Sequence, residues 1–452
     1  MCAVNVGERL ARFVAETQRV PDGALLQAKR AALDTLGVAL AGSREVSARA
    51  VADWLRDQGG RPEAAVLGRT LRLTAADAAL ANGTAAHALD FDDVSLPMRG
   101  HPSAPLLPAV LAVGEAAGSS GRDLLEAFVL GVEVEAKLGR AIGGPHYALG
   151  WHATSTLGTL GAAAACARLL RLDAGRTRMA LGIAASLAAG LQQNFGSMTK
   201  PLHAGWAARS GVVAAQLAAR GFSAGAEAVE GPSGFLRAMS GGADPDLAPF
   251  DALGEPFEIV SPGLGVKLYP CCYATHRAID AVLELCAAHG TAPASVAAVR
   301  VEVNRGGMMP LRVEPPATGL EGKFSLAYCL AAALIDGGVG LPSFTDEAVS
   351  RPAVRELMAK VKASEGELAG EFPIGGYAEV RIVLRDGTEY GTRVDVPRGD
   401  PSRPLSWDEL AAKFRDCTGV ALPAGSVDAA LRLIEGLDGL DDVRRLTEAL
   451  TG

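Results

Sequence analysis

Titratable side chains are concentrated in one short stretch of the chain, from His87 to Ser103. From Asp90 the stretch reads DFDDVSLPMRGHPS, so three carboxylates, two imidazoles and one guanidinium lie close together in sequence. Side chains of these types are rarely fully buried unless they are paired, yet Ala-rich apolar stretches flank the segment on both sides. A titratable cluster in an apolar scaffold is typical of a catalytic or ligand-binding site.

Three other segments carry cationic side chains beside glycine or proline. They are GWHATSTLGT with His152, MTKPLHAG with Lys200, and GVKLYPCCYATHRAID with Lys267, Tyr269 and His276. If these side chains converge, they form a cationic pocket in a chain whose net charge is −8. Such a pocket in an acidic protein predicts an anionic substrate, with a carboxylate as the first choice.

The motifs that bind common cofactors are absent from the sequence. It contains no GxGxxG after a strand, no GxxxxGK[ST], no GxSxG, no HExxH and no CxxC pair. The sequence therefore favours side-chain acid–base chemistry and predicts neither a cofactor nor a metal. Two alternatives stay open. A donor set for Mg²⁺, Mn²⁺ or Fe²⁺ is available from His87, Asp90, Asp92, Asp93 and His101, and the scaffold could serve a non-catalytic binding protein.

The spacing of hydrophobic residues divides the chain into two regions. Up to about residue 262 the apolar residues recur at helical spacing, with Pro21 and Asp22 opening one helix, Gly42 closing it and Thr74 capping another. Further along, SVAAVRVEVN and YAEVRIVLRDGTEYGTRVDVP alternate as strands do. We therefore expect a mainly α protein, with an all-helical domain over 1–264 and 399–452 and a smaller α+β lid domain over 265–398.

Composition narrows the class of protein further. No apolar stretch approaches the roughly 18 residues of a membrane span, and the start reads as an amphipathic helix and not as a signal peptide. The acidic charge argues against nucleic-acid binding. Seven cysteines without a framework spacing fit a reducing compartment. We expect a cytoplasmic protein that binds a small molecule and neither nucleic acid nor membrane.

Six segments together resemble the MmgE/PrpD family over essentially the whole chain. In order they are HALDFDD with HPS, GWHATSTLGTLGAAAACARLL, SMTKPLHAGWAARSGVVAAQLAARGF, EGPSGF, KLYPCCYATHRAID and KFSLAYC. The family includes 2-methylcitrate dehydratase, cis-aconitate decarboxylase and iminodisuccinate epimerase. The resemblance implies a helical domain built from both chain ends, an α+β lid, an active site in the cleft between them, no cofactor, and a homodimer.

The resemblance also implies which residues act. By motif the active site is Asp90, His101, His152, Lys200 and Lys267, with Arg99, Met98, Tyr269 and His276 expected to bind the substrate. The reaction common to the family transfers a proton, or removes a carboxylate, at a carbon next to a carboxylate. We expect His101 and His152 to be the acid–base pair and Asp90 to orient an imidazole. Lys200, Lys267 and Arg99 suit stabilisation of the enolate.

One position departs from the dehydratase and decarboxylase pattern. Val94 stands where those branches tend to have threonine, and the insert SLPMRG brings Met98 and Arg99 beside His101. The segments MRGHPS and HYALGWH are more similar to the sequences of the epimerase branch. A lyase acting on a small di- or tricarboxylate is therefore the leading hypothesis, and an epimerase of an iminodisuccinate-like dicarboxylate is the alternative.

Several polar residues also have purely structural interpretations. Asp92 and Asp93 could cap a helix or hold a loop. We expect His87, His146 and His203 to be hydrogen-bonded core histidines, and His289 to face a helix C-terminus. The adjacent Cys271 and Cys272 are expected to be buried small side chains with no redox role. Tyr269 could be a pocket wall or a proton donor.

Overall fold

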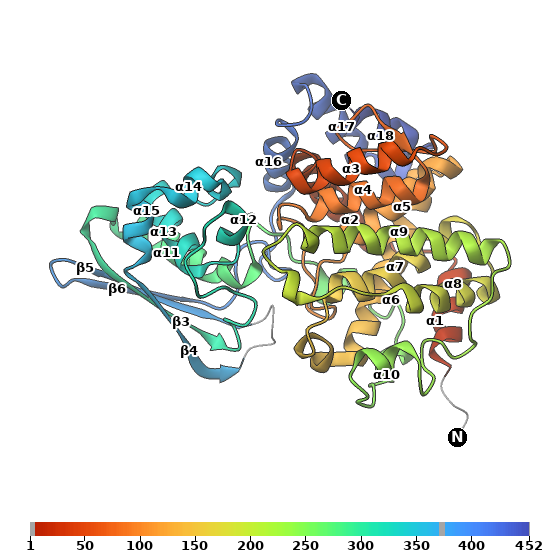
Figure 1. Cartoon of the computed structure of the whole chain (residues 1–452), viewed down its shortest axis with the longest axis horizontal. Coiled ribbons are helices and arrows are strands. Elements are labelled where there is room, and N and C mark those ends of the chain that lie inside the picture. Colours follow the sequence, from red (N-terminus) through yellow and green to blue (C-terminus); the bar gives the residue numbers. More distant parts are fainter. Residues whose placement is uncertain (1–4, 370–375, 452) are drawn as a thin grey trace. The chain divides into compact units, whose positions relative to one another are not determined.

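The computed structural model describes residues 5–369 and 376–451 as two compact units. The first unit comprises residues up to Leu264 together with Ser406 and the residues after it, and the second comprises Gly265–Leu405. Helices dominate the described residues and strands are few, so the predicted mainly α class is confirmed (Figure 1). Residues 1–4 of the predicted first helix lie outside the described residues.

The first unit is built almost entirely of helices. They are α1 (Val6–Glu16), α2 (Asp22–Gly42), α3 (Val46–Gln58), α4 (Ala75–His87), α5 (Ser103–Ala117), α6 (Gly121–Ala148), α7 (Ala153–Leu169), α8 (Ala174–Leu187), α9 (Thr199–Ala219), α10 (Phe235–Met239), α16 (Trp407–Thr418), α17 (Ala424–Glu435) and α18 (Arg444–Ala449). Two short strands, β1 (Ala64–Ala65) and β2 (Arg72–Leu73), pair antiparallel and interrupt this pattern. The expectation of a purely helical domain missed this small ribbon.

Small residues let three helices approach closely at the centre of the first unit. A Cβ added to Gly205 of α9 would stand 2.3 Å from the carbonyl oxygen of Leu80 in α4. A Cβ added to Gly211, further along α9, would stand 2.4 Å from the Cβ of Ala162 in α7. The helices can approach this closely because glycine has no side chain. This packing brings the end of α4 and the starts of α7 and α9 together.

The C-terminal helix α16 packs against α2 and reaches the titratable loop. A Cβ added to Gly37 of α2 would lie 3.0 Å from the ring of Phe414. Beside this contact, the ammonium of Lys413 pairs with Asp34 at 2.6 Å and donates to the carbonyl oxygen of Phe91 at 2.8 Å. A buried lysine therefore anchors the DFDD segment from the opposite end of the chain.

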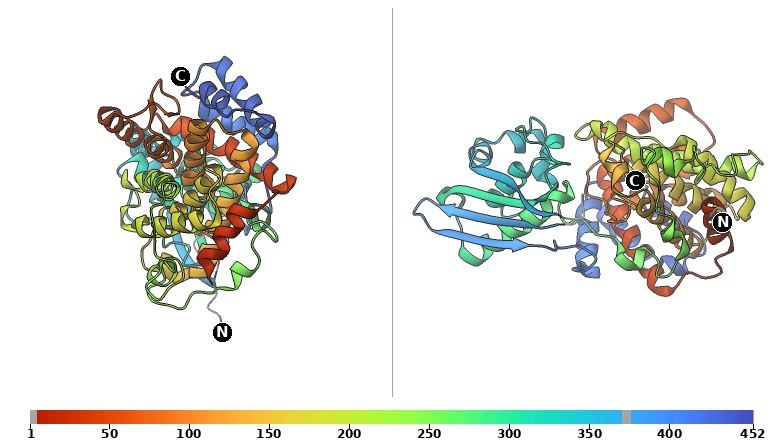
Figure 2. Two further views of the ribbon diagram at one scale, coloured as in Figure 1. Left: turned by 90° about the vertical axis from the view of Figure 1, so that its right-hand side faces the viewer. Right: turned by 90° about the horizontal axis from the view of Figure 1, so that it is seen from below.

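The second unit is a four-stranded sheet with helices packed on it. The strands are β3 (Val296–Arg305), β4 (Val361–Ala369), β5 (Ala378–Leu384) and β6 (Glu389–Val394), in the order β4-β3-β5-β6. β4 pairs parallel to β3, and the other two pairs are antiparallel. The helices, which lie on one face of the sheet (Figures 1 and 2), are α11 (His276–His289), α12 (Gly319–Gly322), α13 (Leu326–Asp336), α14 (Asp346–Ser350) and α15 (Pro352–Met358).

Several local predictions are confirmed residue by residue. α2 begins at Asp22 and ends at Gly42, and the hydroxyl of Thr74 caps α4 by accepting from Asp77 N. On β3, Val299 and Val301 are buried while Arg300 is exposed, as the alternation predicts. Within the described part of the chain, we find no helix that combines the length and apolar character needed to span a membrane.

Candidate active site

The loop between α4 and α5 presents the titratable residues of the 87–103 segment. α4 ends at His87, and the backbone then turns at Asp90, whose φ is 51°. Aspartate tolerates this left-handed conformation better than most residues. A second positive φ, 55° at Arg99, closes a short turn in which Ser95 and Gly100 pair. The two turns fold the polar side chains toward one another.

Close contact with α7 fixes the second of these turns. A Cβ added to Gly100 would lie 2.9 Å from the backbone nitrogen of Thr154, so only glycine fits without displacement. The backbone N–H of His101 donates to the hydroxyl of Thr154 at 3.1 Å. His101, from the loop, is therefore held beside the N-terminus of α7, where His152 is the N-cap residue.

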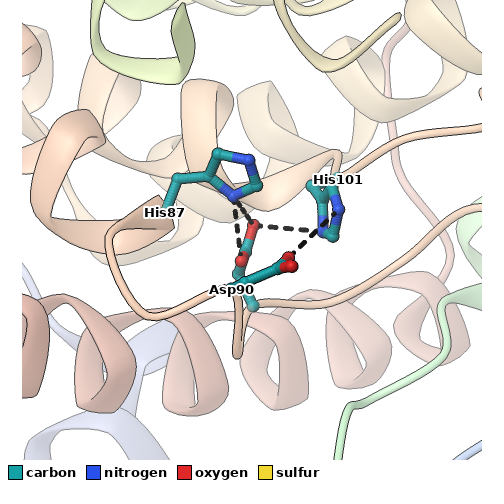
Figure 3. Close-up of side chains that lie close together, drawn as sticks. His87, Asp90 and His101 are labelled. Carbon is teal, nitrogen blue, oxygen red and sulfur yellow. Dashed lines mark hydrogen bonds and ion pairs between the residues drawn. The ribbon is translucent and has the colours of Figure 1, made fainter. Parts of the chain in front are cut away.

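The Asp92 carboxylate lies between the imidazoles of His87 and His101. Figure 3 shows His87, Asp90 and His101 close together on this loop. His87 Nδ1 is 2.8 Å from Asp92 Oδ2, and His101 Nδ1 is 3.3 Å from the same oxygen. His101 Nδ1 is also 2.9 Å from the carbonyl oxygen of Asp93. Both partners of His101 Nδ1 are acceptors, so this nitrogen carries the proton and Nε2 of neutral His101 is left as the basic atom.

Asp90 connects His101 to a buried cation. Its Oδ1 atom is 2.9 Å from Lys200 Nζ and 3.6 Å from His101 Nε2. Lys200 stands in the first turn of α9 and is only 5% exposed. The sequence predicted that Asp90 orients an imidazole. In the structure, Asp92 and the Asp93 carbonyl hold His101 Nδ1, while Asp90 contacts the other side of that ring.

His152 and His203 extend this group of rings. Ring centroids are 4.6 Å apart for His87 and His101, 5.6 Å for His87 and His152, and 5.3 Å for His152 and His203. We call these four residues the imidazole cluster. Burial holds the pKa of His152 well below its usual range, and the positive charge of Lys200 adds to this effect. His152 is therefore neutral at physiological pH.

Asp93 faces away from the imidazoles and caps a helix. Its Oδ1 accepts from the backbone nitrogen of Ser103 at 3.1 Å, and its Oδ2 bonds the Ser103 hydroxyl at 2.5 Å. These contacts satisfy the N-terminus of α5. Burial raises the pKa of Asp93 to about 8. The two adjacent aspartates thus differ, because Asp92 pairs with imidazoles and Asp93 serves structure.

The remaining residues predicted on this loop lie in different surroundings. Met98 is buried in the hydrophobic core with Val134 and Leu138 of α6, so its side chain packs with apolar residues. Arg99 is partly exposed, and its charge contributes to lowering the pKa of His146. Val94 is buried. A substrate-binding role for Met98 and Arg99 stays a prediction.

The other predicted site residues belong to the second unit. Lys267 is fully buried. The hydroxyl of Tyr269 donates to Asp280 Oδ1 at 2.6 Å, and its ring lies 5.1 Å from that of His276. His276 begins α11, with Nε2 3.4 Å from the carbonyl oxygen of Cys271. Asp90, His101, His152 and Lys200 therefore form one group, and Tyr269 and His276 another. Their predicted joint action with Lys267 stays a prediction.

Comparison with known proteins identifies the family. The MmgE/PrpD N-terminal domain matches residues 8–248, and the MmgE/PrpD C-terminal domain matches residues 269–445. The chain belongs to the MmgE/PrpD family.

Curated relatives of this MmgE/PrpD chain agree with the domain matches. Cis-aconitate decarboxylase of Mus musculus is 32% identical, over 97% of this chain and 91% of the relative. The enzymes of the same name from Homo sapiens and Aspergillus terreus are 31% and 29% identical, over 95% and 96% of this chain and 91% and 93% of their own. The chain is thus an enzyme of the MmgE/PrpD lyase type.

The MmgE/PrpD site also contains a set of atoms that could hold a metal ion. Ligand atoms of His87, Asp90, Asp92 and His101 all lie within 4.8 Å of one another. Imidazole and carboxylate together suit a divalent transition metal. The ammonium of Lys200, 2.9 Å from Asp90 Oδ1, would repel such an ion. The residues therefore supply suitable donors but an unfavourable neighbouring charge.

The sequence leaves Asp92 open between a structural and a functional role and predicts His87 and His203 as hydrogen-bonded core histidines. His87 is buried and hydrogen-bonded as predicted, and the structure adds that Asp92 is its partner and that His203 contacts His152. One available signal was spacing, because Lys200 and His203 are three residues apart and so share one face of α9. No sequence signal reveals that Asp92 lies between two imidazoles, since this depends on the turn at Asp90.

Proposed function

We propose that this chain is a cofactor-independent lyase that acts on a small di- or tricarboxylate. Decarboxylation of cis-aconitate is the first reaction to test, because the relatives named above carry that activity. The observation that carries the proposal is the buried group in which Lys200, Asp90, His101 and His152 lie together. It combines a cation with imidazoles that can exchange protons, which are the two requirements of this chemistry.

Electrostatic stabilisation is the first requirement. When a carboxylate leaves, or when a proton leaves a carbon beside one, negative charge builds up on the adjacent carboxylate. A fixed cation in a site shielded from water stabilises that charge without reorganising in the transition state. Lys200 meets this description because it is buried and held by Asp90. We propose that Arg99 adds positive charge to this group.

Proton transfer is the second requirement. Loss of CO₂ leaves an electron pair on carbon that a general acid must protonate, whereas dehydration needs one base for carbon and one acid for the departing hydroxyl. His101 and His152 can fill either pair of roles because they lie on separate segments. Acceptors hold the proton of His101 on Nδ1, so Nε2, which lies 3.6 Å from Asp90 Oδ1, is the atom that would exchange a proton. The lowered pKa of His152 keeps it neutral and able to accept a proton.

Proton NMR in D₂O tests this proposal with citrate, 2-methylcitrate, cis-aconitate and iminodisuccinate as substrates. A lyase releases CO₂ or produces new vinyl signals, and decarboxylation places one solvent deuterium on the product. An epimerase, the alternative that the MRGHPS segment favours, instead washes deuterium into the substrate without net loss. If no acid in this panel reacts or exchanges a proton, the proposal is wrong.

Metal-assisted catalysis is a second candidate because four ligand atoms lie within 4.8 Å of one another. It predicts that a chelator abolishes turnover and that added Mn²⁺, Mg²⁺ or Fe²⁺ restores it. Cofactor independence predicts full activity after chelation and dialysis, with substoichiometric metal by elemental analysis. We also propose a homodimer, which light scattering coupled to size exclusion tests.

A further inference from the structure

A direct hydrogen bond joins the buried His152 to a partly exposed histidine. His152 Nδ1 lies 3.0 Å from His203 Nδ1. His152 is 2% exposed, whereas His203 is only partly buried. The two come from different elements, since His152 precedes α7 and His203 lies in the first turns of α9. The contact therefore leads from the interior of the imidazole cluster toward its edge.

The backbone holds both rings in place for this contact. The backbone N–H of His152 donates to the carbonyl oxygen of Gly190 at 3.0 Å, and the Ser155 hydroxyl donates to the carbonyl oxygen of His203 at 3.1 Å. A Cβ added to Gly190 would stand 3.4 Å from the ring of His203. Phe195 packs edge-on against His152, with centroids 5.0 Å apart. Neither ring has to move for a proton to pass along the bond.

A bond between two Nδ1 atoms constrains the tautomers of both rings. Burial lowers the pKa of His203 to about 4 and that of His152 well below its usual range. His87 and Lys200 face both rings, and His101 also faces His152; as cations, these neighbours lower the pKa of each ring further. A neutral imidazole has one N–H and one lone pair. One Nδ1 must therefore donate and the other accept, so the two rings hold opposite tautomers.

We propose that His203 is a positioning residue that sets the tautomer of His152 and passes protons between it and solvent. This inference rests on the proposed function, in which His152 exchanges a proton with the substrate. Decarboxylation makes such a path necessary, because each turnover consumes one proton at carbon. His152 is too deeply buried to be reprotonated directly by bulk water.

The relay balances one proton per turnover. In the starting state His152 carries its proton on Nε2 and His203 carries its proton on Nδ1, which donates to His152 Nδ1. His152 Nε2–H gives its proton to the substrate carbon, whose electron pair was left by CO₂. The Nδ1 proton of His203 moves to His152 Nδ1, and His203 Nε2 takes a proton from water. Both rings have then exchanged tautomers, and reorientation or the reverse shift restores the starting state.

The geometry also provides a matched control at His146. This histidine is likewise buried, and burial lowers its pKa to about 4. Its two nitrogens are instead engaged by the carbonyl oxygen of Met239 at 2.8 Å and the Thr156 hydroxyl at 2.7 Å. It therefore resembles His203 in its lowered pKa, but both of its nitrogens bond groups other than an imidazole. A substitution of His146 measures the structural cost of losing a buried histidine.

The first test does not depend on activity. Long-range ¹H–¹⁵N NMR of the full-length protein, labelled with ¹⁵N-histidine, reports which nitrogen of each neutral ring is protonated. The inference predicts opposite tautomers for His152 and His203, and loss of the His152 preference in His203→Ala. If both rings carry the Nε2 proton, the bond is not formed and the inference fails, whatever the protein catalyses.

The second test uses turnover of cis-aconitate. His203→Asn can keep a hydrogen bond at the Nδ1 position but cannot relay a proton, and His203→Ala removes both. In each variant kcat should fall by roughly 10²-fold, the lower end of general acid–base contributions, with KM unchanged. Added imidazole should restore much of the activity of His203→Ala and none of that of His146→Gln. Wild-type kcat in both His203 variants would overturn the relay alone, whereas an inactive wild-type enzyme would overturn the proposed function and with it the relay.

Discussion

Each unit of this protein contains a buried polar group, but the two groups are bonded differently. In the first unit, imidazoles and carboxylates bond one another, as Asp92 does with His87 and His101. In the second unit, the lysine and the imidazole bond the backbone, since Lys323 donates to the carbonyl oxygen of Pro270 at 2.8 Å and His276 Nε2 lies 3.4 Å from that of Cys271. Tyr269 bonds the Asp280 side chain instead, and no imidazole takes part in that pair.

On the proposed function, this difference separates a group that moves protons from one whose bonds hold structure. A titratable partner can accept or release a proton, so a chain of such partners has several arrangements of similar energy. A backbone carbonyl can only accept a hydrogen bond, and so it fixes its partner in one state. Both groups looked alike in the sequence, as cations beside glycine or proline. The predictions below test whether they behave differently.

The largest expected effect is loss of turnover when a catalytic imidazole is replaced. His101→Gln and His152→Gln should each lower kcat by roughly 10²–10⁴-fold, the contribution typical of general acid–base catalysis. Steady-state kinetics with the best acid from the panel gives this value. His289→Gln, at the exposed end of α11, is the control and should leave kcat unchanged. If His289→Gln lowers kcat by a similar factor, the imidazoles of the two units do not differ in function as predicted.

The adjacent aspartates should differ almost as strongly in turnover. Asp92→Asn withdraws the carboxylate that two imidazoles share, and we expect kcat to fall on the order of 10²-fold because a wrongly held imidazole is a poor acid–base catalyst. Asp93→Asn should leave kcat close to that of wild type, because the Asp93 side chain bonds Ser103 and no imidazole. Equal losses in the two variants would contradict this division of roles.

In the second unit, the main expected effect is on stability. Tyr269→Phe leaves the buried Asp280 without the hydroxyl that donates to it at 2.6 Å. The free energy of unfolding should fall by about 1–3 kcal/mol, the usual cost of an unsatisfied buried acceptor. Chemical denaturation gives this value. If kcat falls while stability is unchanged, Tyr269 instead contacts the substrate, as the sequence allowed.

A further expected effect is a change in how stability depends on pH. Burial raises the pKa of Asp93 from its ordinary 3.8 to about 8, so between these values the folded protein holds a proton that the unfolded chain has released. Its contribution to stability is therefore full below 3.8 and is lost as the pH rises through about 8. Asp93→Asn removes this dependence. The midpoint temperature of thermal unfolding of the variant should rise relative to that of wild type as the pH increases across this range. If the two midpoints change with pH in parallel, the raised pKa is contradicted.

Much of the fold followed from local patterns in the sequence. Thr74 caps α4 as expected, and the alternation of Val299 and Val301 placed them in the core. These features depend on neighbouring residues only. The β1 and β2 ribbon was missed because two-residue strands carry no measurable periodicity.

The candidate site was predicted less completely, because its geometry depends on distant contacts. His101 and Lys200, which the sequence assigns to one site, both contact Asp90 in the structure. The placement of Asp92 depends on the left-handed turn at Asp90, and that of Met98 in the core depends on α6. Neither arrangement has a counterpart in residue type or spacing, so a single sequence could not provide them.

The most direct test of the account is deuterium incorporation during turnover in D₂O, compared between wild type, His101→Gln and His152→Gln. We predict that the wild-type product of cis-aconitate carries one solvent deuterium on carbon. One or both variants should form that carbon–deuterium bond at least about 10²-fold more slowly while remaining folded. If both variants form the labelled product at the wild-type rate, the imidazole cluster does not carry the proton transfer and the central claim is wrong.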